Sequence, residues 1–248
     1  MSSAATVLEL LSRGADEATA LSAPGGTPLS YGQLRALVGG TVAALNSCGI
    51  GRDDRVALVV DNGPHAASAF LAIAAGATAA PLNPAYRADE FEFYLTDLRA
   101  RLLIVEAGKQ SPALDIASKL GIPIARLVVT PERGAGSFTL ELPPGPHAAA
   151  ARPGAAERDD IALVLHTSGT TSRPKIVPLA QRNVCASARN VATTLALTAS
   201  DRALNIMPLF HIHGLIAGTL APLSVGGAVS CTPGFNALKF FGWMSEAR

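Results

Sequence analysis

The stretch Arg55-Val-Ala-Leu-Val-Val60 decides the fold, because it is a nearly unbroken apolar run that ends at a polar turn. Such a run is typical of a strand that is buried on both faces of a parallel sheet. Outward from it, helical patterns alternate with further apolar runs. We expect helices at 64–75, 88–98 and 111–120, and strands at 78–81, 102–105 and 124–129. This alternation predicts an α/β fold with a mostly parallel sheet flanked by helices.

The regular pattern extends on both sides of this region. Ser30 and Gln33 form a capping-box pattern and Gly49 is placed as a stop, so we expect a helix between them. After an interruption, we expect strands at 161–166, 176–178, 204–207 and 228–231, and helices at 181–195, at 212–223 and from Asn236 onward.

The interruption at 131–160 is rich in proline and glycine. This composition supplies neither a helix nor a central strand, so we expect an exposed connection. It divides the chain into a first α/β portion at 1–130 and a second at 161–248.

Charge and composition exclude several classes of protein. The 248 residues carry 20 Lys and Arg against 19 Asp and Glu, so the formal charge of +1 predicts no nucleic-acid partner. With 49% apolar and 16% charged residues, the chain is expected to fold around a core. Cys48, Cys185 and Cys231 are far apart and have no neighbours at metal-ligand spacing, which predicts no disulfide framework and no metal site.

The sequence predicts a cytoplasmic protein without a membrane span. Residues 1–17 have no basic n-region, so they do not resemble a secretory signal, and the cysteine usage suits a reducing compartment. The uncharged span 203–238 is long enough to cross a bilayer. However, Pro208, Pro222 and Pro233 interrupt it, which favours several short buried elements.

The segment His166-Thr-Ser-Gly-Thr-Thr-Ser-Arg-Pro-Lys175 carries the chemistry. It follows an apolar strand and combines five hydroxyls, one glycine and two cations in ten residues. Gly169 lets the backbone N–H groups approach an anion, the hydroxyls donate hydrogen bonds, and Lys175 adds a point charge. By composition alone, a Ser/Thr-rich surface turn is equally compatible with the segment.

The loop Thr167-Ser-Gly-Thr-Thr-Ser-Arg-Pro-Lys175 closely resembles the phosphate loop of the acyl-adenylate-forming superfamily, which includes the acyl-CoA synthetases. Three further blocks resemble family segments in the same order: Leu29-Ser-Tyr-Gly-Gln-Leu34, the region from Phe70 to Tyr86, and Met207-Pro-Leu-Phe-His-Ile-His-Gly214. The resemblance implies the N-terminal part of that family's fold.

The resemblance also implies roles for individual residues. Those expected around the β- and γ-phosphates of ATP are Thr167, Ser168, Gly169, Thr170, Thr171 and Lys175. His211 is expected beside the substrate carboxylate, with His213 and Gly214 in the pocket wall. ATP, Mg²⁺ and CoA are the implied cofactors and cosubstrates, and a carboxylic acid is the implied substrate. Without the resemblance, His211 and His213 fit equally well as histidines that are satisfied within an apolar segment.

Two departures from the family pattern concern the loop. Ser172 and Ile176 stand where most relatives carry glycine, which reduces backbone freedom. This version of the loop, together with Phe210-His-Ile-His-Gly-Leu215, looks most like the oxalate–CoA ligase branch and suggests a small dicarboxylate. Fatty, aryl and malonyl-type acids stay open, since the residues that set acid length lie largely beyond Arg248 in the family.

Family members continue with an aromatic-Gly-x-Thr-Glu block, a ribose-binding aspartate, a hinge and a lid that carries a catalytic lysine. None of these blocks is found in this sequence. We therefore expect an N-terminal fragment of an AMP-forming acyl-CoA synthetase that is inactive in isolation.

The alternative is a catalytically silent module that forms a homo-oligomer through the apolar helix with Phe240, Phe241 and Trp243. A dinucleotide-binding oxidoreductase is disfavoured, because no Gly-x-Gly-x-x-Gly follows the first strand of the alternating pattern.

Overall fold

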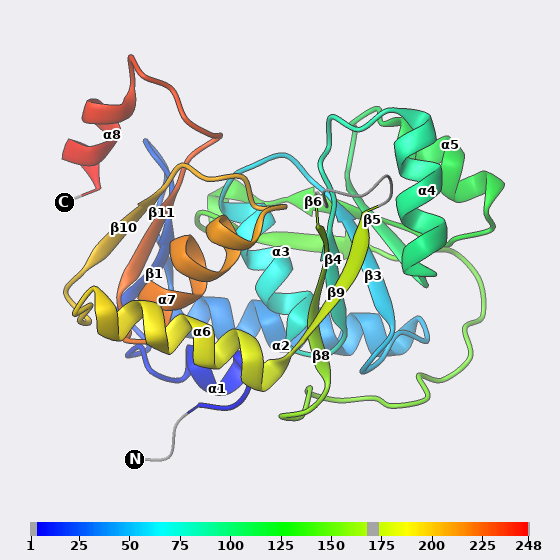
Figure 1. The fold of residues 1–248 in the computed structure, drawn as a ribbon, viewed down its shortest axis with the longest axis horizontal. Coiled ribbons are helices and arrows are strands. Elements are labelled where there is room, and N and C mark those ends of the chain that lie inside the picture. The colour runs from blue at the N-terminus through cyan, green and yellow to red at the C-terminus, as the bar shows by residue number, and fades with distance from the viewer. Residues whose placement is uncertain (1–3, 168–173, 248) are drawn as a thin grey trace.

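Two sheets with helices between and around them form the molecule (Figure 1). The computed structural model describes residues 4–167 and 174–247. The larger sheet has seven strands in the order β7-β6-β5-β3-β4-β8-β9. These strands are β3 (Arg55–Val59), β4 (Thr78–Pro81), β5 (Leu102–Glu106), β6 (Ile124–Val129), β7 (Phe138–Glu141), β8 (Ile161–Thr167) and β9 (Lys175–Ala180). Its inner pairs are parallel, and the outer pairs β6–β7 and β8–β9 are antiparallel. The prediction of an α/β fold with a mostly parallel sheet is confirmed.

The smaller sheet joins the two ends of the chain. Its four strands lie in the order β10-β11-β1-β2. They are β1 (Thr19–Ser22), β2 (Leu29–Ser30), β10 (Arg202–Asn205) and β11 (Ala228–Cys231). β1 pairs with β11 in parallel, with Leu21 opposite Val229. A strand from the first thirty residues therefore completes a sheet whose other parallel strands come after residue 200.

The helices cover the sheets on several sides. They are α1 (Val7–Leu11), α2 (Tyr31–Ser47), α3 (Pro64–Ala74), α4 (Ala88–Leu98), α5 (Pro112–Lys119), α6 (Gln181–Thr194), α7 (Ala221–Leu223) and α8 (Phe240–Glu246), with a 3₁₀ turn at Pro131–Arg133 and a π-helix at His213–Leu220. α3 lies in the middle of the molecule (Figure 1), and its residues from Ala66 to Ala74 are all buried. A helix that is apolar on every side suits such a position between two sheets.

Two cores lie on opposite faces of the seven-stranded sheet. The larger core joins that sheet, through α3, to the four-stranded sheet and α6. The smaller core lies under α4 and α5, where Phe91 and Leu95 of α4 pack with Val164 of β8. Leu163, the neighbour of Val164, belongs to the larger core. Successive residues of β8 therefore face different helices, as strand geometry requires.

The expected exposed connection at 131–160 contains more structure than the sequence indicates. β7 pairs with β6 at the sheet edge, and Phe138 is only 4% exposed. The expectation of no central strand holds, because β7 is an edge strand. The expected exposure is found for most of residues 141–159, whereas residues 134–138 are buried. The domain boundaries at residues 130 and 160 stay a prediction.

Several other elements differ from expectation. The sequence patterns gave no element before Ser30, where α1, β1 and β2 lie. The helix at 212–223 forms largely as a π-helix, and the last helix begins at Phe240 rather than Asn236. These short elements depend on distant partners for their stability, so local periodicity did not indicate them.

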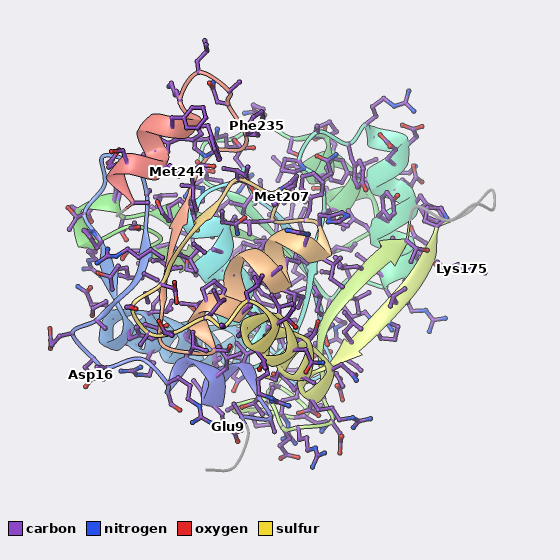
Figure 2. The ribbon with its side chains drawn as sticks, turned by 60° about the vertical axis from the view of Figure 1, so that its left-hand side comes forward. Glu9, Asp16, Lys175, Met207, Phe235 and Met244 are labelled. Carbon is purple, nitrogen blue, oxygen red and sulfur yellow. The ribbon has the colours of Figure 1, made fainter. Side chains whose placement is uncertain are left out.

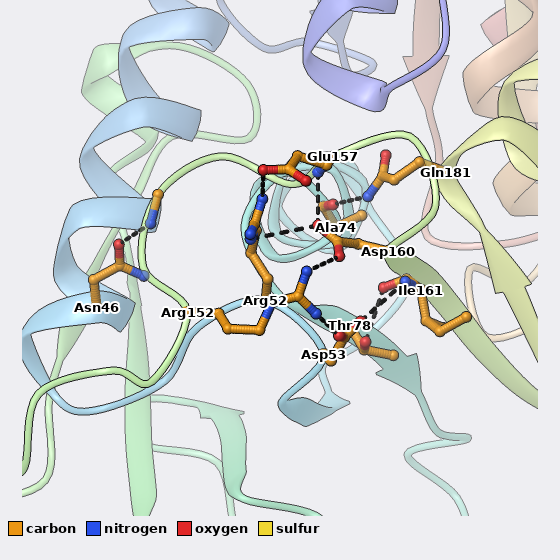
Figure 3. A network of polar contacts seen from close by, with 11 residues as sticks. Asn46, Arg52, Asp53, Ala74, Thr78, Arg152, Glu157, Asp160, Ile161 and Gln181 are labelled. Carbon is orange, nitrogen blue, oxygen red and sulfur yellow. Dashed lines mark hydrogen bonds and ion pairs between the residues drawn. The ribbon is translucent and has the colours of Figure 1, made fainter.

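A network of ion pairs attaches the connection to the start of β8 (Figure 3). The carboxylate of Asp160 accepts hydrogen bonds from Arg152 Nη2 at 2.6 Å and from the backbone N–H of Glu157 at 2.7 Å. Arg52 pairs with Glu157 and Asp160, and Arg152 also pairs with Asp53. Asp160 is only 5% exposed, so its charge is neutralised within the network. The backbone N–H of Ile161, the first residue of β8, donates to Asp53 Oδ1 at 3.3 Å, so the network joins the start of β8 to the turn before β3.

Candidate functional site

The end of the β8–β9 hairpin holds the two described residues of the phosphate loop. Thr167 is the last residue of β8, Lys175 is the first of β9, and the two are cross-strand partners. Partners in an antiparallel ladder share a face, so their side chains lie together at the mouth of the loop. Both residues are exposed, and Figure 2 shows Lys175 at the outer end of the hairpin. The predicted phosphate ligands Ser168, Gly169, Thr170 and Thr171 lie outside the described residues.

The predicted carboxylate-binding residues lie in a tight turn after β10. The backbone N–H of His211 donates to the Pro208 carbonyl at 3.2 Å, and the N–H of His213 donates to Nδ1 of His211 at 3.2 Å. Because Nδ1 accepts this bond, the neutral ring of His211 carries its proton on Nε2. The ring is exposed, so it presents an N–H donor of the kind that binds a carboxylate oxygen.

Gly214 is required by the shape of this turn. A Cβ atom at this position would lie 2.4 Å from the carbonyl oxygen of Pro208. Real Cβ atoms do not approach backbone oxygens so closely, so any larger residue would displace the turn. Glycine at this position therefore has a steric reason.

The side chain of Asn205 anchors the histidine turn from the protein interior. It is 3% exposed, and its Nδ2 donates to the Gly214 carbonyl at 3.0 Å and to Thr219 Oγ1 at 3.1 Å. Its Oδ1 accepts from the backbone N–H of Met207 at 3.1 Å. The Thr219 hydroxyl donates to the same Gly214 carbonyl at 2.8 Å. One buried amide thus joins the end of β10 to the first turn of the π-helix.

Asn62 connects this turn to the seven-stranded sheet. It lies in the loop after β3, where its Oδ1 accepts from the N–H of Leu209 at 2.8 Å. Its Nδ2 donates to the carbonyl of Thr232 at 2.9 Å, just beyond β11. Asn62 therefore ties the histidine turn and the end of β11 to a loop of the other sheet.

A groove of about 730 Å³ borders the histidine turn. Its walls come from α6, β10 and the π-helix, and its apolar lining includes Val191, Leu195, Leu204 and Met207. His213 lies in the same lining, on the side of the π-helix. The groove therefore joins an apolar surface to one imidazole.

The predicted site residues form two groups. Thr167 and Lys175 belong to the seven-stranded sheet, whereas His211, His213 and Gly214 follow a strand of the four-stranded sheet. α6 packs against β8 and β9 and also against the π-helix, so it is the element that the two groups share.

Comparison with known families decides the family of the chain. The family described as AMP-binding enzyme matches residues 11–247. The chain belongs to the AMP-binding enzyme family. It is 40% identical over 240 residues to an oxalate–CoA ligase of Arabidopsis thaliana, which covers 95% of this chain and 46% of the relative. A probable CoA ligase of Humulus lupulus, CCL9, is 41% identical over 207 residues, covering 82% of this chain and 39% of the relative.

Solved structures agree with this AMP-binding enzyme assignment. ATP-bound MatB from Rhodopseudomonas palustris superposes with a TM-score of 0.80 at 26% identity, covering 98% of this chain and 48% of that one. The expected resemblance to the N-terminal part of the acyl-adenylate-forming fold is confirmed. The chain spans less than half the length of each of these relatives.

The three cysteines of this AMP-binding enzyme chain lie in its interior. Cys48, Cys185 and Cys231 are buried and free, and burial raises the pKa of Cys185 and Cys231 to about 12. Protonated buried thiols are poor nucleophiles.

Across residues 4–167 and 174–247, no group of three His, Cys, Asp or Glu residues is placed to hold a metal ion. Within the same ranges, no helix has the length and apolarity that a bilayer crossing requires.

Sequence reasoning missed Asn62 and Asn205. Asn205 has a weak signal, because it is one amide within the apolar run at 203–209. An isolated polar residue in such a run needs buried partners. Asn62 has no comparable signal, since Asp61-Asn-Gly-Pro64 reads as an ordinary polar turn.

Proposed function

We propose that this chain is the N-terminal part of an AMP-forming acyl-CoA synthetase. The full enzyme would activate a carboxylic acid with ATP to an acyl-adenylate and then transfer the acyl group to CoA. Membership of the AMP-binding enzyme family and the CoA ligase names of the two relatives support this proposal. The single observation that carries it is the pairing of Thr167 with Lys175 across the mouth of the hydroxyl-rich loop.

The residues of the predicted phosphate loop would act by screening charge. Attack of a carboxylate on the α-phosphorus brings two anions together, so donors and cations must surround the phosphates. In this proposal Lys175 supplies the point charge, and the backbone and hydroxyls between Thr167 and Thr171 donate hydrogen bonds. Mg²⁺ would enter with the nucleotide phosphates, which are its usual partners in such sites.

The histidine turn would orient the acid. Nε2–H of His211 is the donor proposed to hold one carboxylate oxygen, while His213, which lines the groove, would form part of the wall. Gly214 is buried and does not line the groove, so its part is to let the turn close. Asn205 would keep His211 in place, because its side chain ties Met207 to Gly214 on either side of the histidine.

Oxalate is the first acid to test, because of the 40% identical relative. The groove beside His213 is mainly apolar, which also favours an acid with a hydrocarbon part. Malonate and longer acids therefore belong in the same assay. A cytoplasmic location stays a prediction.

The test is ATP–pyrophosphate exchange by the full-length protein that contains this chain. Lys175→Ala is expected to slow exchange more than tenfold, because a hydrogen bond to a charged group contributes about 1.5–3 kcal/mol. The free energy of unfolding should stay unchanged, since Lys175 is exposed. Lys239→Ala, another exposed lysine, is the matched control. Unchanged exchange in Lys175→Ala would refute the assigned role.

A second candidate concerns the 248-residue chain alone, for which we propose no ligase activity. Leu238 is 98% exposed, Phe241 73% and Phe235 66%, which suits a self-associating module. Sedimentation at high protein concentration tests this candidate, and a strictly monomeric profile would count against it.

A further inference from the structure

The outer end of β8 has little support from the sheet. β8 pairs with β4 where Leu163 lies opposite Ala79, and among the described residues no β4 partner follows along the strand. Its other neighbour, β9, is the edge strand of the sheet. Thr167, which starts the predicted phosphate loop, therefore lies beyond the part of β8 that the inner sheet holds. Leu165 and Ile176 pack against the two cores here, so a directional side-chain contact is needed to fix the position of this strand end.

His166 supplies that contact. Its Nε2 lies 2.9 Å from Oδ2 of Asp97, near the end of α4, and the histidine side chain is only 6% exposed. The ring of Tyr94 packs edge-on against the imidazole, with centroids 4.7 Å apart. Tyr86 stacks on Tyr94 at 4.7 Å with 13° between the ring planes. The imidazole is thus held by one directional bond and by an aromatic wall.

The geometry of the strand transmits this hold to the loop. His166 shares the α4 face of β8 with Val164, whereas Thr167 points to the opposite face together with its partner Lys175. His166 and Thr167 are consecutive, so rotation or sliding of the strand at His166 would move Thr167 and Lys175. An apolar side chain such as Val164 fills space without fixing direction, but a hydrogen bond to a carboxylate fixes both distance and angle.

We propose that His166 and Asp97 form a positioning pair that sets the end of the β8–β9 hairpin for phosphate binding. This inference rests on the proposed function, because it assigns the pair to the ATP side of that site. Neither residue is a catalytic residue. Their effect reaches the phosphates through Thr167 and Lys175.

The experiment uses the full-length protein and the variants His166→Phe, Asp97→Ala and Asp97→Asn. His166→Phe and Asp97→Ala are expected to raise the KM for ATP about fivefold, with kcat and the KM for the acid within about twofold of the wild type. Asp97→Asn keeps an acceptor oxygen and should recover most of the ATP affinity. The double variant should be no worse than either single variant, because both remove the same bond.

The control is Glu92→Gln, which breaks the 2.7 Å ion pair between Glu92 of α4 and Lys119 of α5 without touching β8. It should leave the KM for ATP unchanged. Hydrogen exchange of the amides at 165–167 and 175–177 gives a readout that does not need activity, and it should accelerate in His166→Phe and Asp97→Ala only.

Two results would overturn the inference: a KM for ATP in both variants equal to that of Glu92→Gln, or amide exchange at 165–167 and 175–177 equal to the wild type. Absence of pyrophosphate exchange in the wild type with every acid tested would instead count against the proposed function. The amide-exchange measurement would still decide whether the pair holds the hairpin.

Discussion

The histidine turn and the end of the β8–β9 hairpin are held in different ways. The turn rests on two side-chain amides, because the buried Asn205 and the half-buried Asn62 bond to backbone groups on both sides of it. The hairpin end lies at a sheet edge and is held by a hydrogen bond between the His166 imidazole and the half-exposed carboxylate of Asp97. The comparison teaches that one half of the candidate site is built into the core, while the other depends on a peripheral contact.

Replacement of Asn205 should destabilise the histidine turn, which is the part of the site that is anchored in the core. Asn205→Ala leaves the Met207 N–H and part of the bonding at the Gly214 carbonyl without a partner, so we expect the free energy of unfolding to fall by about 2–3 kcal/mol. Denaturant unfolding measures this change. Asn190→Ala, on the exposed side of α6 beside the same groove, should have an effect below about 0.5 kcal/mol. Equal losses in the two variants would argue against Asn205 as the anchor.

Removal of Asn62 should loosen the turn from the larger sheet. Asn62→Ala breaks the bonds to Leu209 and Thr232, and because Asn62 is half-buried we expect a loss of about 1–2 kcal/mol in the free energy of unfolding. The matched control is Asn83→Ala, whose side chain accepts a local bond from the N–H of Ala85 after β4. A smaller loss in Asn62→Ala than in Asn83→Ala would show that the two sheets do not depend on this bridge.

A pH titration should distinguish the uncharged amides of the turn from a buried histidine, His65, which lies in α3 outside both anchored regions. His65 lies near the carboxyl ends of β3 and β5, and burial lowers its pKa below the ordinary 6.5, although Glu106 Oε2 lies 3.5 Å away and favours the charged ring. Burial outweighs this attraction, and Nε2 is buried without a hydrogen-bond partner. The folded protein thus binds the proton more weakly than the unfolded chain does. We expect stability from His65 to be complete above pH 6.5 and to be lost as pH falls through the lowered pKa.

The measurement is the free energy of unfolding between pH 5 and pH 7, compared with that of His65→Gln. In the His65→Gln variant, the free energy of unfolding should fall less steeply as the pH is lowered. An Asn205→Ala protein should keep the wild-type decline, because the bonds that Asn205 makes go to backbone groups and to the Thr219 hydroxyl, which carry no charge. Identical pH profiles for the wild type and His65→Gln would contradict the direction assigned to His65.

Local patterns predicted much of the larger sheet. The run at 55–60 and the helices that follow it appear as β3, α3, α4 and α5 within a few residues of the expected bounds. The capping box at Ser30 is also formed, since Ser30 Oγ accepts from the Gln33 N–H and Gln33 Oε1 accepts from the Ser30 N–H. These features depend on neighbours within a few positions, so the sequence displays them directly.

Long-range partners were not predictable in the same way. Asp97 bonds to a histidine 69 positions away, and Asn62 bonds to a carbonyl 170 positions away. The local sequence around a single Asp or Asn does not indicate whether its side chain bonds to a residue far away in the chain. The buried parts of 131–160 were missed for the same reason, because proline and glycine indicate irregular backbone but not where that backbone packs.

The sequence by itself determined the α/β class, the order of its main helices and strands, and the hydroxyl-rich loop with its family resemblance. Each of these features follows from hydrophobic periodicity or from a short motif, because local sterics and local hydrogen bonds determine them. Only the tertiary structure decided that β1 completes the sheet of β10 and β11, that α3 lies between two sheets, and that Asn62, Asn205 and Asp97 hold the two halves of the candidate site. Those arrangements arise from burying apolar surface and satisfying polar groups across the whole chain, and neither condition can be read from neighbouring residues.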